Sequence, residues 1–567
     1  MNIQEEMKER IDVAAGRKKA DLVIKNARIF DVFTGEFFEG DLAVSGGVIA
    51  AIGSYEGKEE VDGSGKTIVP GFMDGHVHLE SSTVTPKQYA KVAVPHGTTA
   101  VMADPHEIAN VCGTAGIDYM LKASENLPLD VYVMVPSCVP ASPFDESGYV
   151  LKAEDIKKYL DNERVLGLAE MMNYPGVIAA DSEVVKKIAY TQEAGKVTDG
   201  HAPSLRGNDV NAYITAGIYS DHENETVDEA IDKIRRGQWV MVREGTVCKN
   251  LEDLLPLCRE PYYRRCMFVT DDKHAGDIKR EGHIDHIIKR AISLGVDPKV
   301  AYTMATLNPA LHFKVSNSGA ICPGYKADFL ILDDFEKVDI NQVYKSGKLV
   351  YDKAEGDKVI FDWKDEYKAD DAITNTVNFD DVSAEDLKIA DKAKVIGLVP
   401  KGVLTTDEGW ADDCNLSKDI IKLAVVERHH KTGHIGLCYV KGYGLKEGAI
   451  ATSIAHDSHN IICVGCNDED MAVAINELKK TKGGMAVVKD GKVINELALP
   501  IAGLICDLEA DLSQKKLSEI KDAARALGVS EKMDPLLNMS FASLAVIPKL
   551  RLTTLGVVDV EKFELVK

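Results

Sequence analysis

Residues 67–82 read TIVPGFMDGHVHLESS, and this stretch decides how the rest of the chain is interpreted. Its first part is apolar and predicts a buried strand, which ends in His76-Val77-His78. Residues i and i+2 of a strand project to the same face, so the two imidazoles point at one place. Such a pair predicts ligands for a divalent metal ion. Because a bare HxH motif is common by chance, the prediction depends on whether further candidate metal ligands occur elsewhere in the chain.

The region downstream of this stretch alternates apolar strands with polar helices, which is the rhythm of parallel βα units. Eight strand candidates occur, and eight is the number that closes a barrel. They cover residues 68–78, 98–105, 130–137, 164–170, 195–201, 217–222, 239–245 and 266–272. A doubly wound open sheet is the alternative, but no glycine-rich dinucleotide turn follows the first strand. The sequence therefore predicts an α/β fold built on a (β/α)8 TIM-like barrel.

Short strand patterns flank the predicted barrel of residues 69–315. Those in residues 20–68 and 316–365 are expected to pair in a small composite β-sandwich domain, preceded by an N-terminal helix in residues 1–19. Residues 390–567 mix strands and helices and predict a C-terminal α+β domain, with a hairpin turn at Asp490-Gly491. The polar run at 362–376 is the expected linker.

Charge and cysteine usage limit the classes of partner and the compartment. The 567 residues include 67 Lys plus Arg against 90 Asp plus Glu, a net charge of −23 that repels phosphate backbones and anionic lipids. We therefore expect no nucleic-acid or membrane partner. The N-terminus lacks an apolar signal core and no apolar run reaches membrane-spanning length, which favours a cytoplasmic protein. The eleven cysteines indicate reduced thiols, and Cys463 and Cys466 are expected to be buried at a strand end.

Imidazoles and carboxylates recur at the ends of later predicted strands: Glu170 on the fourth, His201 on the fifth, His222 on the sixth and Asp271 on the eighth. Any one of them alone would be read as a capping or solvated residue at a strand-to-loop junction. Strand ends converge at the C-terminal face of a barrel, where such enzymes place their chemistry. Six metal-type residues at five converging strand ends therefore predict a metal site.

Four imidazoles and two carboxylates are more than one tetrahedral site uses, so two ions that share a bridging carboxylate are expected. Glu170 is the predicted bridge. The other five ligands divide into His76, His78 and Asp271 for one ion, and His201 and His222 for the other. Two close ions lower the pKa of a bridging water, which makes a hydroxide nucleophile available near neutral pH.

Several motifs resemble those of the amidohydrolase superfamily: residues 67–82, the NPA run at 308–310 and GAICPGYKADFLILD at 319–333. A finer resemblance, over nearly the whole chain, is to the adenine deaminase family. It is carried by ADPHEIANVCG (103–113), AEMMNYPGV (169–177), TDGHAP (198–203), YSDHE (219–223), FVTDDKHAGD (268–277) and IATSIAHDSHNIICVG (450–465).

Differences between this sequence and the motifs of other hydrolase and deaminase families favour the resemblance to the adenine deaminase family. Hydantoinase and dihydroorotase types usually bridge their metals with a carboxylated lysine, whereas the fourth strand here ends in Glu170. Mononuclear adenosine-type deaminases usually carry a glutamate where this chain has Ser204. The zinc nucleobase deaminases of another fold need a PCxxC run, and the sequence contains none.

The resemblance implies a hydrolase that converts adenine to hypoxanthine and ammonia, a reaction of purine salvage and adenine catabolism. It implies two divalent metal ions, manganese or iron, while the ligand types also suit zinc. Asp271 would accept the proton of the nucleophile and help to pass it to the departing nitrogen, and Glu170 would act beside it. The alternatives are an amidohydrolase of another aminopurine or of a cyclic amide, and a non-catalytic relative that serves in assembly.

Substrate contacts are expected from two segments. His106 and Glu107 follow the second strand and are candidates to bind purine nitrogens, or they only order their loop. His456, Asp457 and His459 follow a strand of the C-terminal region, and they either fold over the pocket or form an internal hydrogen-bond network. A homodimer is expected because large barrel enzymes often pair.

Overall fold

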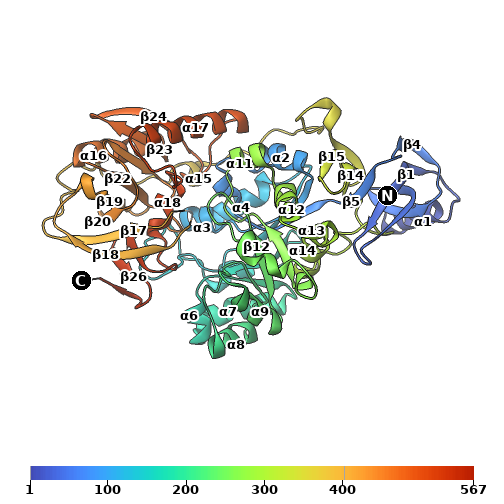
Figure 1. The fold of residues 1–567 in the computed structure, drawn as a ribbon, viewed down its shortest axis with the longest axis horizontal. Helices are drawn as coiled ribbons and strands as arrows, with labels where there is room; N and C mark the ends of the chain where they lie inside the picture. Colours follow the sequence, from blue (N-terminus) through green and yellow to red (C-terminus); the bar gives the residue numbers. More distant parts are fainter. Residues whose placement is uncertain (1, 401, 567) are drawn as a thin grey trace.

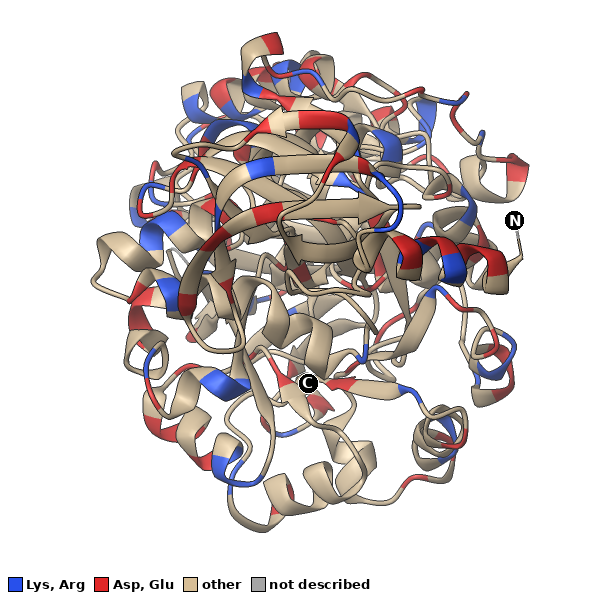
Figure 2. Ribbon diagram, turned by 90° about the vertical axis from the view of Figure 1, so that its right-hand side faces the viewer, with Lys and Arg blue, Asp and Glu red and all other residues tan. Residues whose placement is uncertain are grey.

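The computed structural model describes residues 2–400 and 402–566, in three regions that follow one another along its longest axis (Figure 1). A β-sheet region that includes the N-terminal helix lies at one end, an α/β region lies in the middle, and the C-terminal region lies at the other end. Acidic and basic positions are interspersed over the ribbon (Figure 2). Among the helices of the described residues, none is both long enough and apolar enough to cross a membrane.

The middle region contains eight parallel strands in two sheets, of order β10-β9-β8-β7-β6 and β11-β12-β13. These strands are β6 (Phe72–Val77), β7 (Thr98–Ala103), β8 (Asp130–Val135), β9 (Val165–Met171), β10 (Val197–Gly200), β11 (Ser220–Asp221), β12 (Trp239–Arg243) and β13 (Cys266–Val269). Parallel bridges from Val77 to Asp271 and from Thr198 to Ile218 join the two sheets at both edges, so the parallel array curls round on itself. The predicted α/β class is confirmed, with a parallel strand at each of the eight expected places.

Helices follow the parallel strands along the chain. They are α2 (Pro86–Ala93), α3 (His106–Cys112), α4 (Thr114–Ala123), α5 (Ala153–Lys157), α6 (Tyr174–Ile178), α7 (Ser182–Glu193), α8 (Gly207–Thr215), α9 (Val227–Arg235), α10 (Leu251–Leu254), α11 (Ala275–Glu281), α12 (Ile284–Ser293), α13 (Pro298–Ala305) and α14 (Leu307–His312). Inside the curled sheet, Met73, Met102, Met134, Met241 and Met267 belong to one buried cluster. Because the interior is filled with side chains, chemistry is confined to the ends of the strands.

The predicted first strand, residues 68–78, divides into two strands that belong to different sheets. β5 (Thr67–Pro70) pairs with β1 (Ala20–Asp31) and β14 (Phe329–Asp334), whereas β6 pairs with β7. Between them, a Cβ on Gly71 would lie 2.3 Å from Oγ1 of Thr99, so this crossing needs glycine. The expectation of a single strand was wrong because a continuous apolar run does not show where the chain changes sheets.

One flanking sheet combines the two segments on either side of the middle region, in the order β16-β15-β14-β5-β1-β2-β3, with β4 paired to β1. Its other strands are β2 (Glu36–Ser45), β3 (Val48–Gly53), β4 (Gly57–Asp62), β15 (Asp339–Lys345) and β16 (Lys348–Asp352). Helix α1 (Ile3–Ala14) packs against it through Val13, which is buried with Val23, Ala43 and Ala50. The N-terminal segment thus completes a sheet with residues almost 300 positions later.

The C-terminal region holds a second eight-stranded sheet of order β18-β17-β20-β19-β22-β21-β23-β24. Its elements are β17 (Ala393–Leu398), β18 (Thr405–Ala411), β19 (Ile420–Val426), β20 (Ile435–Lys441), β21 (Ala449–Thr452), β22 (Ile461–Gly465), β23 (Gly484–Lys489) and β24 (Lys492–Ala498), with helices α16 (Asp468–Lys480), α17 (Ala510–Ala526) and α18 (Leu537–Ser540). A small sheet of β25 (Leu550–Thr553), β26 (Gly556–Asp559) and β27 (Glu564–Leu565) follows. The expected linker at 362–376 contains only the short α15 (Asp371–Thr374).

Two local predictions in the C-terminal region can be compared with the structure. Asp490 and Gly491 form the two-residue turn between β23 and β24, and both have the positive φ that a type I′ hairpin requires, 51° and 71°. Cys463 is buried in β22 and Cys466 is half-buried just after it; both are free thiols. Burial raises the pKa of Cys466 to about 12, which keeps this thiol protonated at neutral pH.

Candidate metal centre

The six predicted ligands are buried and lie close together at the carboxyl ends of the parallel strands. β6 contains His76 and is followed closely by His78, and β9 contains Glu170. His201 directly follows β10, His222 directly follows β11, and Asp271 lies two residues after the end of β13. The convergence follows from the topology, because neighbouring parallel strands end at the same edge of their sheet. The structure thus brings together all six side chains that the strand-end pattern singled out.

Glu170 lies between two groups of imidazoles, with one carboxylate oxygen toward each group. Its Oε1 lies 3.4 Å from Nε2 of His78 and 3.7 Å from Nε2 of His76. Its Oε2 lies 2.8 Å from Nδ1 of His201 and 3.2 Å from Nε2 of His222. This is the geometry expected of a carboxylate that bridges two cations.

Asp271 completes the first group of imidazoles. Its Oδ1 lies 3.3 Å from Nε2 of His78 and 4.0 Å from Nε2 of His76. Its backbone N–H donates to the carbonyl of His76, 2.9 Å away. Asp271 has a φ of 61°, a conformation that is uncommon for a residue other than glycine and that clusters at functional sites.

Several polar atoms in this cluster have no hydrogen-bond partner in the described part of the chain. Nε2 of His76 is buried and makes no hydrogen bond, although it faces the carboxylates of Glu170 and Asp271. Orphaned buried polar atoms need an explanation, and an unrepresented ion is a common one. Imidazole nitrogens and carboxylate oxygens are donors that zinc, iron and manganese accept. The residues present therefore fit a site for divalent metal ions.

Charges within the cluster compensate one another. Burial alone would raise the pKa of Glu170, but the imidazoles of His222, His201 and His78 lower it well below its usual range. Burial alone would lower the pKa of His222, but Glu170 raises it to about 9. The carboxylate is therefore ionised at neutral pH, as a metal ligand must be, whereas His222 would have to release its proton when a cation binds.

Charged residues that were not singled out from the sequence hold the cluster in place. Arg243, at the end of β12, donates to Oδ2 of Asp271 at 2.7 Å and, through two nitrogens, to both oxygens of Glu223 at 2.6 and 2.9 Å. Oδ2 of Asp199 lies 3.5 Å from Nδ1 of His76. Arg243 and Asp199 lie at or near the ends of parallel strands. The pattern that predicted the metal ligands would therefore have included them if all polar residues at strand ends had been considered.

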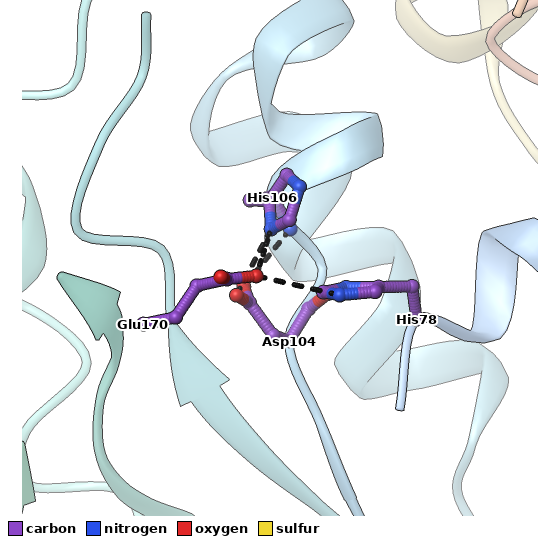
Figure 3. A group of neighbouring side chains, drawn as sticks. All are labelled: His78, Asp104, His106 and Glu170. Carbon is purple, nitrogen blue, oxygen red and sulfur yellow. Dashed lines mark hydrogen bonds and ion pairs between the residues drawn. The ribbon is translucent and has the colours of Figure 1, made fainter. Parts of the chain in front are cut away.

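His106 lies against the metal cluster from the start of α3. Its Nδ1 lies 2.9 Å from Oδ2 of Asp104 and 3.6 Å from Oε1 of Glu170, the oxygen that also faces His78 (Figure 3). Its Nε2 lies 3.8 Å from Oδ1 of Asp457 in the C-terminal region. His106 therefore connects the predicted metal ligands to the segment that contains Asp457.

Glu107 connects the same two regions beside His106. Its Oε1 lies 2.9 Å from Nδ1 of His456, and its other oxygen contacts Nε2 of His459. The structure therefore brings together the five residues predicted to contact substrate. Four of them line a cavity at the metal cluster. His459 does not line the cavity but contacts Glu107, which does.

This cavity has a volume of about 30 Å3 and is closed by both regions. Its polar wall includes Glu170, His201, His222 and Asp271. Its apolar wall includes Met172 of the middle region and, from the C-terminal region, Val403, Phe541, Leu544 and Ile547.

Two family models match this chain. The model described as "Amidohydrolase family" covers residues 67–350, and the model described as "Adenine deaminase C-terminal domain" covers residues 402–564. Together they account for the middle region with part of its flanking sheet, and for the C-terminal region.

Full-length relatives extend both matches. The chain is 47% identical to adenine deaminase 2 of Carboxydothermus hydrogenoformans over 99% of each chain. It is 44% identical to the adenine deaminase of Clostridium acetobutylicum, over 98% of this chain and 99% of that one. Among solved structures it is similar to a β-aspartyl dipeptidase of Fervidobacterium islandicum, with 14% identity, a TM-score of 0.47 and coverage of 59% of this chain and 97% of the other.

Proposed function

Because this chain belongs to the adenine deaminase family of the amidohydrolase superfamily, we propose that it hydrolyses adenine to hypoxanthine and ammonia, a step of purine salvage. The observation that carries the proposal is Glu170, whose two oxygens face different imidazoles of one buried cluster, in a chain that is 47% identical to an adenine deaminase over 99% of its length. A carboxylate in that position favours a bridge between two metals. Glu170 also disfavours a cyclic-amide hydrolase of the lysine-bridged kind.

The proposed cofactor is a pair of divalent ions, manganese or iron, with zinc as a further possibility by ligand type. The residues that would hold them are Glu170 as the proposed shared ligand, His76, His78 and Asp271 for one ion, and His201 and His222 for the other. Bound ions of this kind lower the pKa of a nearby water, which supplies hydroxide at neutral pH to attack the ring carbon that bears the amino group.

Asp271 is the residue proposed to move the proton. Its Oδ1 faces the imidazoles of His76 and His78, while Arg243 holds its Oδ2. In the proposed reaction Oδ1 accepts the proton of the nucleophile and returns it to the departing nitrogen, which leaves as ammonia. The hydrogen bond with His78 and the charge on Arg243 keep this carboxylate ionised until that step by lowering its pKa, although burial opposes ionisation.

Substrate binding is assigned to the residues of the cavity outside the metal cluster. His106, Glu107, His456 and Asp457 line it and present donors and acceptors to a purine, and His459 supports Glu107 from behind. Nε2 of His456 and Oδ2 of Asp457 are buried without hydrogen-bond partners among the described residues, and both atoms are proposed to bind the ligand.

We also infer the finer architecture that positions this site. The bridges that join both edges of the parallel sheets support a (β/α)8 barrel over residues 69–315. Residues 20–68 and 316–365 form the proposed composite β-sandwich domain, residues 1–19 the N-terminal helix and residues 390–567 the C-terminal α+β domain. A homodimer is proposed as the assembly.

An ammonia-release assay tests the proposed function. Manganese-supplemented protein is offered adenine, adenosine, cytosine and dihydroorotate, and a His201→Ala variant serves as control. We expect rapid release from adenine, little from the other three compounds, and loss of release in the variant. Silence on adenine with two metals bound per chain would contradict the proposed substrate and redirect the search to other rings.

A further inference from the structure

Arg551, at the start of β25, is a buried cation bonded through its guanidinium to backbone carbonyls. The side chain is fully buried. Nη1 donates to the carbonyl of Phe541 at 2.6 Å, and Nε donates to that of Ile547 at 2.7 Å. Nη2 donates to the carbonyls of Val403 and Pro548 at 2.6 and 2.8 Å. One side chain therefore ties together three stretches of the C-terminal region.

These stretches carry the apolar wall of the cavity at the metal cluster. Val403, Phe541, Leu544 and Ile547, named here the apolar roof, line that cavity together with Glu170 and the other predicted metal ligands. Phe541, Leu544 and Ile547 form a small core cluster with Leu537 and with Val247 of the middle region, and Val403 packs against it. The roof therefore packs on the middle region through Val247, while the hydrogen bonds of Arg551 hold it from the C-terminal region.

The guanidinium is held there at an energetic cost. Within the described residues its hydrogen bonds all go to backbone carbonyls rather than to a carboxylate, and burial lowers its pKa to about 9. A buried cation without a counterion is costly unless its N–H groups are satisfied. Its retention is explained by geometry, because only the planar fork of arginine reaches several carbonyls in fixed directions.

We propose that Arg551 is a positioning residue that fixes the apolar roof, and that the roof is the surface against which the substrate ring packs. A binding site for a flat heterocycle needs an apolar wall opposite a few polar groups. The metal cluster, His106 and Glu107 supply polar groups, and the roof supplies apolar side chains to the same cavity. This inference rests on the proposed function for the identity of the ring.

The roof is also joined to the predicted substrate-binding segment. The ring of Phe541 is stacked on the ring of His456, with centroids 4.4 Å apart and an interplanar angle of 6°. Oγ of Ser543 donates to the carbonyl of His456 at 3.0 Å. A shift of the roof would therefore move His456 as well, and with it the hydrogen bond to Glu107.

Two variants of the full-length, manganese-loaded protein test the proposal. Arg551→Lys keeps the charge but cannot reach the same carbonyls, and Leu544→Ala removes apolar surface from the roof. We expect each to raise KM for adenine about tenfold. The metal content should stay at the wild-type value, and kcat should change much less than KM.

The control is Arg525→Lys, because Arg525 on α17 also donates to backbone carbonyls, those of Val529, Ser530 and Met533, but it lies outside the cavity lining. Its KM should equal that of the wild type. Arg551→Lys and Leu544→Ala with wild-type KM would overturn the assignment of the roof to substrate binding.

Hydrogen exchange of backbone amides tests the positioning role of Arg551 without any substrate. Amides of residues 537–548 should exchange faster in Arg551→Lys than in wild type or Arg525→Lys, and unchanged exchange would overturn the role of Arg551. If the wild type releases no ammonia from adenine, the proposed function fails and the packing of adenine fails with it. The exchange result still decides whether Arg551 holds the roof.

Discussion

Arg243 donates a hydrogen bond of 2.7 Å to Oδ2 of Asp271, so that Oδ1 is the oxygen of this carboxylate that faces His76 and His78. The same guanidinium forms a two-pronged pair with Glu223, which fixes its plane. Arg243 thus decides how Asp271 is presented to the metal cluster. A ligand that must also move a proton needs such fixed orientation.

Replacement of Arg243 by lysine should therefore reduce turnover. A lysine ammonium cannot hold Glu223 in two places and Asp271 in a third, so the carboxylate of Asp271 is free to rotate. We expect kcat for ammonia release to fall about a hundredfold. Arg236→Lys, on the surface after α9, is the control and should retain wild-type kcat. Full turnover in Arg243→Lys would contradict a positioning role.

Glu170→Gln tests the bridge between the two groups of imidazoles. Glutamine keeps the shape of the side chain, but one of its two terminal atoms becomes an NH2 group, which cannot bind a cation. We expect the metal content, measured by elemental analysis, to fall from two ions per chain to one or fewer. Ammonia release should fall about a hundredfold or more.

A matched control for this variant is Glu229→Gln. Glu229 is equally buried, but it pairs with Lys233 on α9 rather than with the imidazoles. Loss of that ion pair should lower the melting temperature and leave the metal content at two. Two tightly bound metals in Glu170→Gln would show that the two groups of ligands do not share this carboxylate.

Asp271→Asn separates metal binding from proton transfer. Asparagine keeps an oxygen that can ligate, but it cannot accept the proton of the nucleophile. We expect kcat to fall between about 10²-fold and 10⁴-fold, in the range typical of a lost general base, when the metal content is restored by added manganese. Wild-type turnover with both metals bound would exclude Asp271 as the base.

Much of this site follows from the sequence because it depends on local pattern. His76 and His78 share a strand face, and Glu170, His201, His222 and Asp271 follow apolar runs whose ends meet in a parallel array. The two-residue spacing and the strand ends are visible in the chain itself.

The wall opposite those ligands does not follow from the sequence. Phe541 and Ile547 lie some 270 residues after Asp271, in a stretch that contains none of the predicted site residues. Their contact with the cavity depends on how two regions dock, and no local pattern encodes docking. The division of residues 68–78 between two sheets was missed for a similar reason, since pairing partners are set by the tertiary fold.

The last prediction concerns stability at acid pH rather than catalysis. Asp285 on α12 is buried and pairs with Lys289 at 2.7 Å and with Nδ1 of His96 at 3.3 Å. Burial alone would raise its pKa, but the hydrogen bond with His96 and the charge of Lys289 lower it below the ordinary value of 3.8. The ionised carboxylate therefore stabilises the folded state above pH 3.8, and this contribution is lost as the pH falls through the lowered pKa.

Asp285→Asn should lower the free energy of unfolding at pH 7 by about 2 kcal/mol, because it removes the charged partner of the Lys289 ammonium and weakens the contact with the His96 ring. Melting temperatures recorded from pH 7 to pH 3 should show a constant deficit down to about pH 4 and a shrinking one below it. Asp522→Asn, at an exposed position of α17, should melt with the wild type throughout. A deficit in Asp285→Asn that does not shrink below pH 4 would show that the ion pairs are not its cause, and would assign the loss to the hydrogen bond from the backbone N–H of His283 instead.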